Sequence, residues 1–382
     1  MIAAWVGALS FSTWVYLLAG RGRFWQVSRA VTDLKLPLTS PPRVAVVVPA
    51  RNEADVVGRA VRSLLEQDYA GRLQIFVVDD HSSDETASVA RHAAADEGQR
   101  LTVISAMPLP TGWTGKMWAL SQGVQHTAEF APDYFLFTDA DIIHAPDSVT
   151  CLVARAQAGN LDLVSMMALL HCSSLAEHAL IPAFVFFFFM LYPPEWVRNP
   201  KRKTAGAAGG DILVRAEALA RIGGITSIRN ELIDDCALAR EIKRNGSVWL
   251  GLTLNTCSIR GYASFSSVGR MISRTAFYQL RHSGWLLIAT VLGLAITYLV
   301  PPVMVFFGGW AAVWGAAAWL LMSIAFWPTL RFYSRSLTSA PLLPLIALFY
   351  TGATIHSAIQ YWLGQGGEWK GRVQDAKSHL AG

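Results

Sequence analysis

The sequence predicts an α/β fold, in which a doubly wound and mainly parallel sheet forms a central domain and transmembrane helices lie at both ends of the chain. Hydrophobic residues make up 53% of the 382 residues and charged residues only 15%, whereas soluble domains carry about 25% charged residues. The apolar excess is concentrated near the two ends. The middle alternates short apolar runs with helical patterns, which is typical of parallel strands joined by crossover helices.

The first element is the uncharged segment Ile2 to Ala19, which forms an N-terminal transmembrane helix over residues 1–20. A signal peptide is the alternative, but the segment lacks a basic start and a clear cleavage site. Basic residues follow it: Arg21, Arg23, Arg29 and Lys35. The positive-inside rule places these residues in the cytoplasm, so the N-terminus points outward.

A proline-rich linker over residues 21–43 leads to the catalytic domain, which we expect over residues 44–260. Four short apolar runs predict its buried strands: Val44–Val48, Leu73–Val78, Leu101–Ile104 and Tyr134–Thr138. Helical spacing predicts helices over Ala54–Asp68 and Glu85–Ala95. Because ligands of such sheets bind beyond the carboxyl ends of the strands, polar residues at those ends are candidates for a site.

Polar clusters follow the first two strands. The first cluster contains Pro49, Ala50, Arg51 and Glu53, and the second contains Asp79 and Asp80. Carboxylates there can accept hydrogen bonds from a base or from ribose hydroxyls, so we expect both clusters to bind a nucleotide. A turn with a helix cap at Ser83 or Asp84 is the alternative for the second cluster.

The third cluster, Asp139-Ala140-Asp141, directly follows the fourth strand. Two carboxylates separated by one residue can hold a hard cation such as magnesium or manganese, which would bridge to a diphosphate. A solvated turn is the alternative. The position at a strand end favours the metal site, with Asp139 and Asp141 as the ligands.

Several basic residues are candidates for phosphate binding. Lys116 follows a glycine after a predicted turn and can reach a phosphate as a point charge, although an ordinary surface lysine is the alternative. Arg270 and Arg274 share one helical face and can clamp a diphosphate. The alternative for this pair is a basic flank beside the membrane.

Asp234 and Asp235 lie in the first turn of a predicted helix, where negative charge is favoured for structural reasons. The functional interpretation is a general base, because adjacent carboxylates in a poorly solvated cleft raise one pKa. Before them, Gly209, Gly210 and Asp211 form a small-residue turn that lets a substrate approach the backbone. We assign this turn to the acceptor.

The C-terminal third carries a predicted interfacial helix over residues 261–283 and a transmembrane region of about three helices over residues 284–363. Its uncharged runs are Gly284–Val300, Val303–Trp327 and Leu342–Leu363, with Pro301-Pro302 as an external turn. Counting spans places the tail, residues 364–382, outside, whereas its basic residues favour the inside. The two criteria leave the side of the tail open, and a re-entrant last segment, with Pro341 and Pro344 at its start, would reconcile them.

Three further patterns limit the interpretation. The run Ile181–Tyr192 is too short to span a membrane and predicts a core helix or an interfacial segment. The net charge of +5 includes no basic run interleaved with aromatic residues, so a nucleic-acid partner is not expected. The four cysteines have no metal-binding spacing and are expected to be free thiols in a reducing compartment.

Six ordered motifs resemble the family 2 glycosyltransferases of the GT-A fold: VVVPARNEADVV, IFVVDDHSSDET, GWTGKMWALSQG, FLFTDADI, AGGDILVRAEALARIGGI and LIDDCALAREIKRNG. The resemblance implies a nucleotide-diphosphate sugar donor, foremost a UDP-sugar, and inversion at the anomeric carbon. It implies that Asp141 binds the metal and diphosphate, Asp139 supports the ribose, and Asp235 is the base. Asp234-Asp235 replaces the family's usual Glu-Asp, which leaves the identity of the base open.

More narrowly, GWTGKMWAL, FFFFMLYPPEWVRNP, IRGYASFSSVGRMISRTAFYQLRHS and QGGEWKGRVQD resemble the hopene-associated glycosyltransferases of bacterial hopanoid biosynthesis. This resemblance implies a membrane lipid acceptor and a multi-pass protein of the bacterial inner membrane with a cytoplasmic catalytic domain. The Gln-x-x-Arg-Trp signature of processive synthases is missing, which favours non-processive transfer. A processive polysaccharide synthase and a catalytically silent membrane scaffold are the alternatives.

Overall fold

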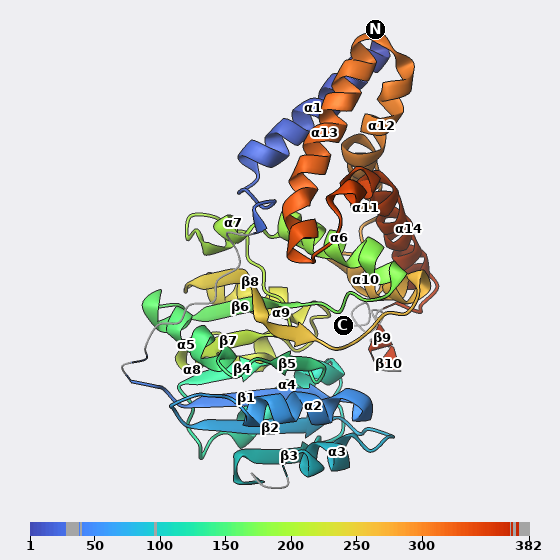
Figure 1. The fold of residues 1–382 in the computed structure, drawn as a ribbon. Helices are drawn as coiled ribbons and strands as arrows, with labels where there is room; N and C mark the ends of the chain where they lie inside the picture. Colours follow the sequence, from blue (N-terminus) through green and yellow to red (C-terminus); the bar gives the residue numbers. More distant parts are fainter. Residues whose placement is uncertain (28–37, 39, 95–97, 367, 370–371, 374–382) are drawn as a thin grey trace.

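The computed structural model describes residues 1–27, 38, 40–94, 98–366, 368–369 and 372–373 (Figure 1). An eight-stranded sheet forms the lower part of the molecule in this view, and the apolar helices from the two ends of the chain lie together above it. Predicted features at residues 28–37 and 374–382, in the linker and the tail, lie outside the described residues. The α/β fold with apolar helices at both ends is therefore confirmed.

The strands are β1 (Val44–Ala50), β2 (Leu73–Asp79), β3 (Leu101–Ser105), β4 (Tyr134–Phe137), β5 (Ile142–His144), β6 (Leu163–Leu169), β7 (Ile212–Arg215) and β8 (Val248–Ser258). Their order is β3-β2-β1-β4-β7-β6-β8-β5. The pairs β2–β3, β1–β2, β1–β4 and β6–β8 are parallel, whereas β7 is antiparallel to both of its neighbours and β5 to β8. The sheet is thus mainly parallel, as predicted, with antiparallel pairs in the half that the sequence analysis did not assign.

Apolar residues on both faces explain why β1 lies inside the sheet. All seven of its residues are buried. Ala45 and Val47 belong to one hydrophobic core, and Val44, Val46 and Val48 belong to the other, as the alternation of side chains along a strand requires. Both faces must therefore be covered by helices, which is the doubly wound arrangement.

The helices of the domain are α2 (Ala54–Leu65), α3 (Thr86–His92), α4 (Gly115–His126), α5 (Ser148–Ala158), α8 (Ala216–Arg221) and α9 (Asp234–Lys243). Residues of α2, α3 and α5 contribute to one core, and residues of α4, α8 and α9 to the other. The helix α4 lies close against β1, because a Cβ added at Gly123 would fall 2.3 Å from Val47 Cγ1. Gly123 is therefore required for this close packing.

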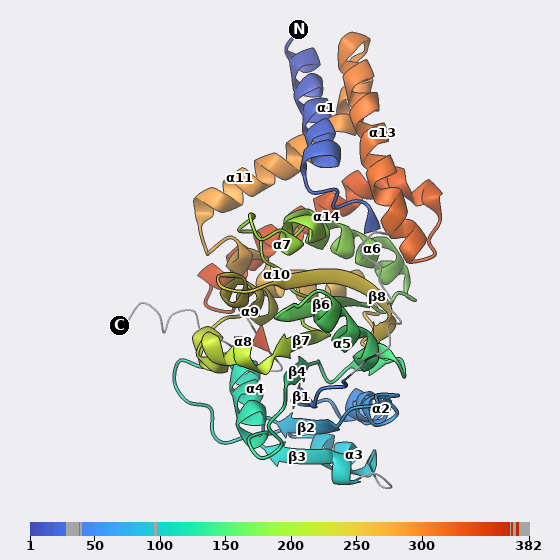
Figure 2. The same cartoon turned by 90° about the vertical axis from the view of Figure 1, so that its left-hand side faces the viewer.

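The remaining helices are α1 (Ile2–Gly20), α6 (Leu175–Leu191), α7 (Pro194–Arg198), α10 (Phe265–Gln279), α11 (Gly284–Leu294), α12 (Val300–Met304), α13 (Gly309–Phe332) and α14 (Leu343–Trp362). Figure 2 shows α1 and α13 standing side by side above the sheet, whereas α6 and α14 run across beneath them. One hydrophobic core continues from the α4 face of the sheet to Trp14, Phe186 and Phe326 of these helices. The domain and the apolar helices therefore form one packed body.

Five helical segments in the described part of the chain are long and apolar enough to cross a membrane: Ile2–Gly20, Leu175–Arg198, Gly284–Phe307, Gly309–Phe332 and Leu337–Trp362. The predicted turn at Pro301-Pro302 is wrong. A π-helical turn over Ala295–Leu299 leads into α12, where the prolines occupy the first turn and need no intrahelical N–H bond. The chain reverses instead at Gly308 and Gly309, which have positive φ angles of 70° and 51°.

The helix that contains the apolar run Ile181–Tyr192 is also longer than predicted. The helix α6 begins at Leu175, because Ser174 caps it and Glu177 completes a capping box with the Ser174 backbone. Together with α7 it reaches 24 residues, of which half are buried. It runs across the molecule between the sheet and the α1–α13 pair (Figure 2), as expected of a core helix.

Candidate active site

Three segments that are distant in the sequence meet at the carboxyl end of β4. Asp139 follows this strand, Lys116 lies in the first turn of α4, and Asp234 and Asp235 begin α9. The Lys116 ammonium pairs with Asp139 Oδ1 at 2.9 Å and with Asp234 Oδ2 at 3.2 Å. The structure therefore brings together one predicted phosphate-binding residue, one predicted metal ligand and the predicted base.

Burial and neighbouring charges in this cluster shift the pKa values of Lys116 and Asp235. Burial alone would lower the pKa of Lys116, but the carboxylates of Asp139, Asp234 and Asp235 raise it above the ordinary lysine range. Burial, reinforced by the negative charge of Asp234, raises the pKa of Asp235 to about 7. A carboxylate with such a pKa can take up a proton near neutral pH, as a general base must.

Gly209 forms the open centre of the cluster. A Cβ added there would lie 3.5 Å from Asp235 Oδ2, 3.5 Å from Lys116 Nζ and 3.7 Å from Asp139 Oδ2. These are ordinary contact distances, so the backbone tolerates the added atom. A side chain at this position would, however, fill the space that the three charged groups share.

Asp141 lies beside this centre in a second polar cluster. Its Oδ2 accepts a hydrogen bond from Ser258 Oγ at 2.7 Å and lies 3.3 Å from Arg260 Nε. Arg260 Nη2 also donates to both oxygens of Glu53, at 2.7 and 2.8 Å. One guanidinium thus joins the end of β1, the segment after β4 and the segment after β8.

Both clusters open into one cleft of about 790 Å³. The predicted residues on its lining are Pro49, Glu53, Lys116, Asp139, Asp141, Gly209, Gly210, Asp234, Asp235, Arg270 and Arg274. The opposite wall comes from helices that lie outside the sheet domain. It includes Phe184 and Phe188 of α6, Met271 of α10, and His356 and Gln360 of α14.

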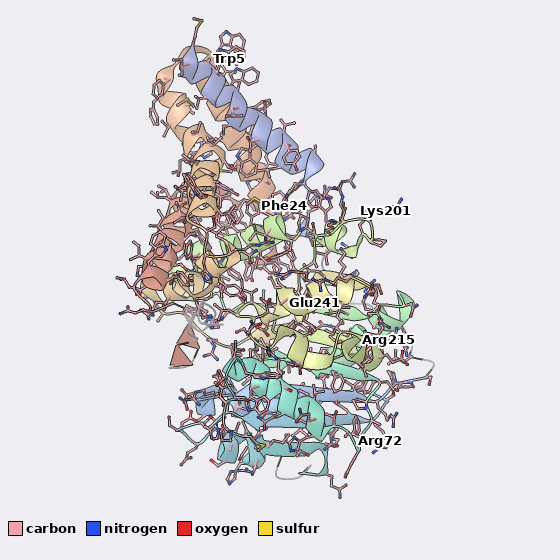
Figure 3. The ribbon with its side chains drawn as sticks, turned by 180° about the vertical axis from the view of Figure 1, so that it is seen from behind. Trp5, Phe24, Arg72, Lys201, Arg215 and Glu241 are labelled. Carbon is pink, nitrogen blue, oxygen red and sulfur yellow. The ribbon has the colours of Figure 1, made fainter. Side chains whose placement is uncertain are left out.

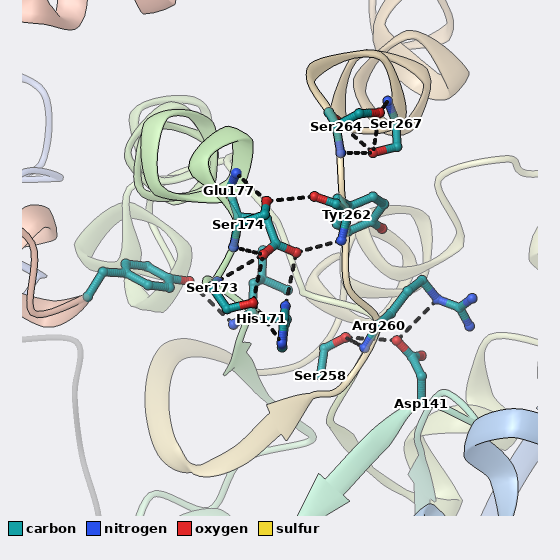
Figure 4. A network of polar contacts seen from close by, with 12 residues as sticks. Asp141, His171, Ser173, Ser174, Glu177, Ser258, Arg260, Tyr262, Ser264 and Ser267 are labelled. Atoms are coloured by element: carbon teal, nitrogen blue, oxygen red, sulfur yellow. Dashed lines mark hydrogen bonds and ion pairs between the residues drawn. The ribbon is translucent and has the colours of Figure 1, made fainter.

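A buried carboxylate fixes this wall relative to the Asp141 cluster. Glu177, at the start of α6, accepts hydrogen bonds from the backbone N–H groups of Ser173 at 2.9 Å, Ser174 at 2.8 Å and Tyr262 at 2.5 Å. The chain from Tyr262 leads directly back to Arg260 and Ser258, which hold Asp141 (Figure 4). The position of α6 and the position of Asp141 are therefore linked by a short run of hydrogen-bonded backbone.

Most of the predicted residues in the polar clusters after β1 and β2 lie outside this cleft. Ala50, Arg51, Asp79 and Asp80 are not on the lining of this cleft. Asp79 accepts a short hydrogen bond from Ser82, and Arg51 donates to the Asp80 carbonyl and lies 3.8 Å from its carboxylate. Their assignment to the nucleotide stays a prediction.

Asp211 also lies away from the cleft lining, although its neighbours Gly209 and Gly210 are on it. It is 1% exposed, and Thr256 Oγ1 lies 3.4 Å from its Oδ2. Burial raises the pKa of Asp211 to about 8, so its carboxyl group is mainly protonated at neutral pH. An acceptor in the cleft would meet the two glycines rather than this side chain.

In the described part of the chain, no three histidine, cysteine, aspartate or glutamate side chains are grouped to hold a metal ion. Asp139 and Asp141 nevertheless both face the cleft. Magnesium is commonly held by one or two carboxylates together with phosphate oxygens and water. The donor set therefore fits a cation that arrives with a diphosphate, rather than one held by the protein alone.

Arg260, Tyr262, Glu231 and the α14 residues His356 and Gln360 line the cleft but were not predicted. Arg260 had only a weak signal, because the segment before Ser258-Ile259-Arg260, VWLGLTLNTC, contains Thr253, Asn255 and Thr256 among its apolar residues. The α14 residues had none. Their presence in the cleft depends on how α14 packs against α10.

Comparisons with known proteins relate the sheet domain to glycosyltransferases. Residues 45–223 match the model of glycosyl transferase family 2. An N-acetylglucosaminyltransferase of Rhizobium leguminosarum bv. viciae is 38% identical over 119 residues, which cover 31% of this chain and 26% of that protein. A 4,4'-diaponeurosporenoate glycosyltransferase of Staphylococcus aureus is 32% identical over 126 residues, which cover 32% of this chain and 31% of that protein. The chain thus spans about a quarter to a third of the length of these relatives.

A solved structure shares the fold over most of its length. It is a mannosyltransferase from Pyrobaculum calidifontis in complex with GDP-Man and Mn²⁺. The TM-score is 0.54 at 20% sequence identity, and the alignment covers 92% of this chain and 98% of that one. The coverage includes the apolar helices as well as the sheet domain.

Proposed function

We propose that this chain, whose residues 45–223 form a family 2 glycosyltransferase domain of the GT-A fold, transfers a sugar from a nucleotide-diphosphate sugar to a membrane lipid. The transfer is inverting, metal-dependent and non-processive. The acceptor belongs to hopanoid biosynthesis, and a UDP-sugar is the donor. The relative from Staphylococcus aureus, which is named as a 4,4'-diaponeurosporenoate glycosyltransferase, supports the lipid assignment.

One observation carries the proposal. Asp235, Asp139 and Lys116 lie on one side of a cleft whose other side is built by α6, α10 and α14. Residues of these helices share one hydrophobic core with residues of the apolar helices α1 and α13. An acceptor with an apolar body can therefore lie against Phe184, Phe188 and Met271 while its hydroxyl group reaches the charged cluster.

The reaction follows from the position of Asp235. Its carboxylate takes the proton from the acceptor hydroxyl, whose oxygen forms a bond to the anomeric carbon of the donor. The bond between that carbon and the diphosphate oxygen breaks, and the nucleotide diphosphate leaves with the electron pair. A single displacement of this kind inverts the anomeric centre, and Gly209 leaves room for the reacting atoms.

Charge neutralisation of the leaving group needs several cations. Asp141 and Asp139 would hold a magnesium or manganese ion, which when bound would offset the charge of the diphosphate. The mannosyltransferase that shares the fold was solved with Mn²⁺, which supports this assignment. Arg270, Arg274 and Lys116 line the same cleft and supply further positive charge.

The proposed arrangement in the membrane follows from the helices. The helix α1 and the pair formed by α11–α12 and α13 cross the bacterial inner membrane, and the catalytic domain lies in the cytoplasm. The helix α14 lies re-entrant at the cytoplasmic surface, because it packs mainly against α10 and because Gln365 and Gly366, just after it, line the catalytic cleft. This arrangement places the tail inside, as its basic residues require.

The proposal is tested by mass spectrometry of lipids extracted from cells that express the full chain, an Asp235→Asn variant or neither. We expect a lipid with one added sugar only with the unmodified chain. The mass difference identifies the sugar, and the parent mass identifies the acceptor. A polymer of sugars on the product would contradict non-processive transfer, and an unchanged product in the Asp235→Asn cells would contradict the assigned base.

A further inference from the structure

A group of positively charged side chains gathers away from the cleft, on the side where α7 meets the end of α1. We call Arg21, Arg155, Arg198, Lys201, Arg202 and Lys203 the basic patch. Lys201, Arg202 and Lys203 are consecutive and exposed. In Figure 3, Lys201 extends away from the molecule at the height of Phe24, between the apolar helices and the sheet. No residue of the patch has an ion pair with an acid among the described residues.

Two indole rings organise the arginines. The guanidinium carbons of Arg21 and Arg202 each lie over the Trp196 ring, 4.9 Å from its centroid. The guanidinium carbons of Arg155 and Arg198 lie over the Trp249 ring, at 4.8 and 5.4 Å. A stacked guanidinium keeps N–H groups at its edge, which are the groups that bind phosphate oxygens.

The patch also brings like charges together. Arg155 and Arg198 share the Trp249 ring, and burial together with the charge of Arg198 lowers the pKa of Arg155. Arg155 Nε is buried and has no hydrogen-bond partner. Burial lowers the pKa of Arg198, and the negative charge of Glu195 in the same helix opposes this shift. The six positive charges of the patch outnumber this acid, which favours binding of an anion.

The loop that carries the patch is held in one shape. Lys243, at the end of α9, donates hydrogen bonds to the carbonyls of Trp196 at 2.9 Å, Val197 at 2.5 Å and Thr204 at 2.6 Å. The Lys201 backbone N–H donates to Asn199 Oδ1 at 2.9 Å, which closes a turn. Lys201, Arg202 and Lys203 are therefore presented by a fixed loop.

The patch lies at the end of an apolar helix. Gly22 has a φ of +59°, and a Cβ there would fall 2.8 Å from the Trp196 ring, so only glycine lets the end of α1 approach α7 so closely. Above this point, Trp5, Leu9 and Tyr16 of α1 are exposed apolar side chains that suit contact with lipid tails. In the membrane arrangement proposed above, the patch therefore lies at the level where the lipid tails end and the head groups begin.

We propose that the basic patch binds the phosphate groups of anionic phospholipids in the leaflet next to the catalytic domain. Stacked arginines provide fixed donors, and the exposed loop provides further positive charge near the head groups. The site is separate from the catalytic cleft, and this inference does not depend on the proposed reaction.

The test uses the full chain in nanodiscs that contain equal amounts of phosphatidylcholine and phosphatidylglycerol. Native mass spectrometry counts the lipids of each class that stay bound. We expect phosphatidylglycerol to be enriched on the unmodified chain. The enrichment should fall on the order of fivefold for each cation removed in the variant Lys201→Ala/Arg202→Ala/Lys203→Ala. Raising the salt to 1 M, where the Debye length is about 3 Å, should weaken it as well.

The matched control removes three exposed arginines from α2 and α3, at the opposite end of the molecule, in the variant Arg59→Ala/Arg62→Ala/Arg91→Ala. It carries the same change in net charge and should keep the enrichment. Equal enrichment in the unmodified chain and the loop variant would overturn the proposal. An equal loss in the control would overturn it too, because the effect would then reflect net charge alone.

Discussion

The strand ends at β2 and at β4 both carry consecutive or near-consecutive aspartates, yet the carboxylates at the two ends have different surroundings. At β2 the acidic groups are satisfied within the protein. Asp79 accepts from Ser82, and Asp84 accepts from the backbone N–H groups of Ala54 at 3.1 Å and Thr86 at 3.0 Å. At β4 the carboxylates of Asp139 and Asp235 both border the open centre at Gly209, and Lys116 pairs with Asp139 and Asp234.

The difference separates a structural role for Asp84 from a chemical role for Asp235, while the nucleotide-binding role of Asp79 and Asp80 stays a prediction. The hydrogen bonds of Asp84 join the segments after β1 and β2 and stabilise the fold. At the β4 end burial, reinforced by the negative charge of Asp234, raises the pKa of Asp235 to about 7, which costs stability and creates a base. Substitutions at the two ends should therefore affect different measurements.

The largest effect is expected for Asp235→Asn. Loss of a general base should reduce the turnover of sugar transfer by about 10²–10⁴-fold. The affinity for the donor and the midpoint temperature of thermal unfolding should stay the same or rise. The reason is that asparagine, unlike aspartate, places no negative charge in this buried position. Steady-state turnover, donor titration and thermal unfolding measure the three quantities. Asp55→Asn, on the exposed side of α2, is the matched control and should leave all three unchanged. Turnover of Asp235→Asn near the wild-type rate would show that Asp235 is not the base, and the β4 end would then lose the chemical role that distinguishes it from the β2 end.

Gly209→Ala tests the open centre itself. The added methyl group meets Asp235, Lys116 and Asp139 at ordinary contact distances, so folding should be preserved. It displaces the reacting atoms by about one methyl radius, which we expect to reduce turnover about 100-fold. Gly293→Ala is the control, because a Cβ there meets no atom within 4 Å. A fully active Gly209→Ala enzyme would show that substrate does not occupy this space.

The pH dependence of transfer tests the origin of the base. Asp235 must be ionised to accept a proton, so kcat/KM should rise with pH and level off above about 7. Below that value the ionised fraction falls tenfold per pH unit, which predicts about a 100-fold lower kcat/KM at pH 5. The residual activity of Asp235→Asn should lack this inflection. An inflection near pH 4 in the unmodified enzyme would mean that burial and Asp234 do not shift the base.

The same contrast shows what sequence patterns can predict. The apolar runs of β1, β2 and β4 predicted a doubly wound sheet, because strands buried on both faces read as continuous apolar segments. Their strand ends then identified Asp139, Asp141 and Glu53. The strands β5 to β8 escaped prediction. Strands β5 and β7 have only three and four residues, whereas β6 and β8 were missed despite their seven and eleven residues. The antiparallel pairing of β5 and β7 is set by long-range contacts that no local pattern records.

The membrane-side half was harder to predict for a physical reason. Hydropathy identifies a helix of sufficient length, but it does not distinguish a helix that crosses a membrane from one that lies along its surface. Thus the last uncharged run could be a span or a re-entrant segment by its sequence, and the packing of α14 against α10 brings His356 and Gln360 into the cleft. The start of α6 was readable in Ser174 and Glu177, which form a capping box.

The smallest effect is expected at the β2 end, for Asp84→Ala. Loss of its bonds to Ala54 and Thr86 removes a cap from the start of α2 and should lower the free energy of unfolding by about 0.5–2 kcal/mol, with turnover unchanged. Partial burial opposes ionisation, but the hydrogen bonds from Thr86 and Ala54 lower the pKa of Asp84, so its contribution is present above the ordinary aspartate pKa and is lost as the pH falls through the lowered value.

Chemical denaturation of Asp84→Ala and of the unmodified chain at pH 7 and at pH 3 measures this contribution. The difference in stability should shrink at the lower pH. Glu129→Ala removes an exposed acid of the same domain and should show no such difference at either pH. If Asp84→Ala instead kept its stability and lost turnover, Asp84 itself would act in the donor site, and its structural role would be contradicted.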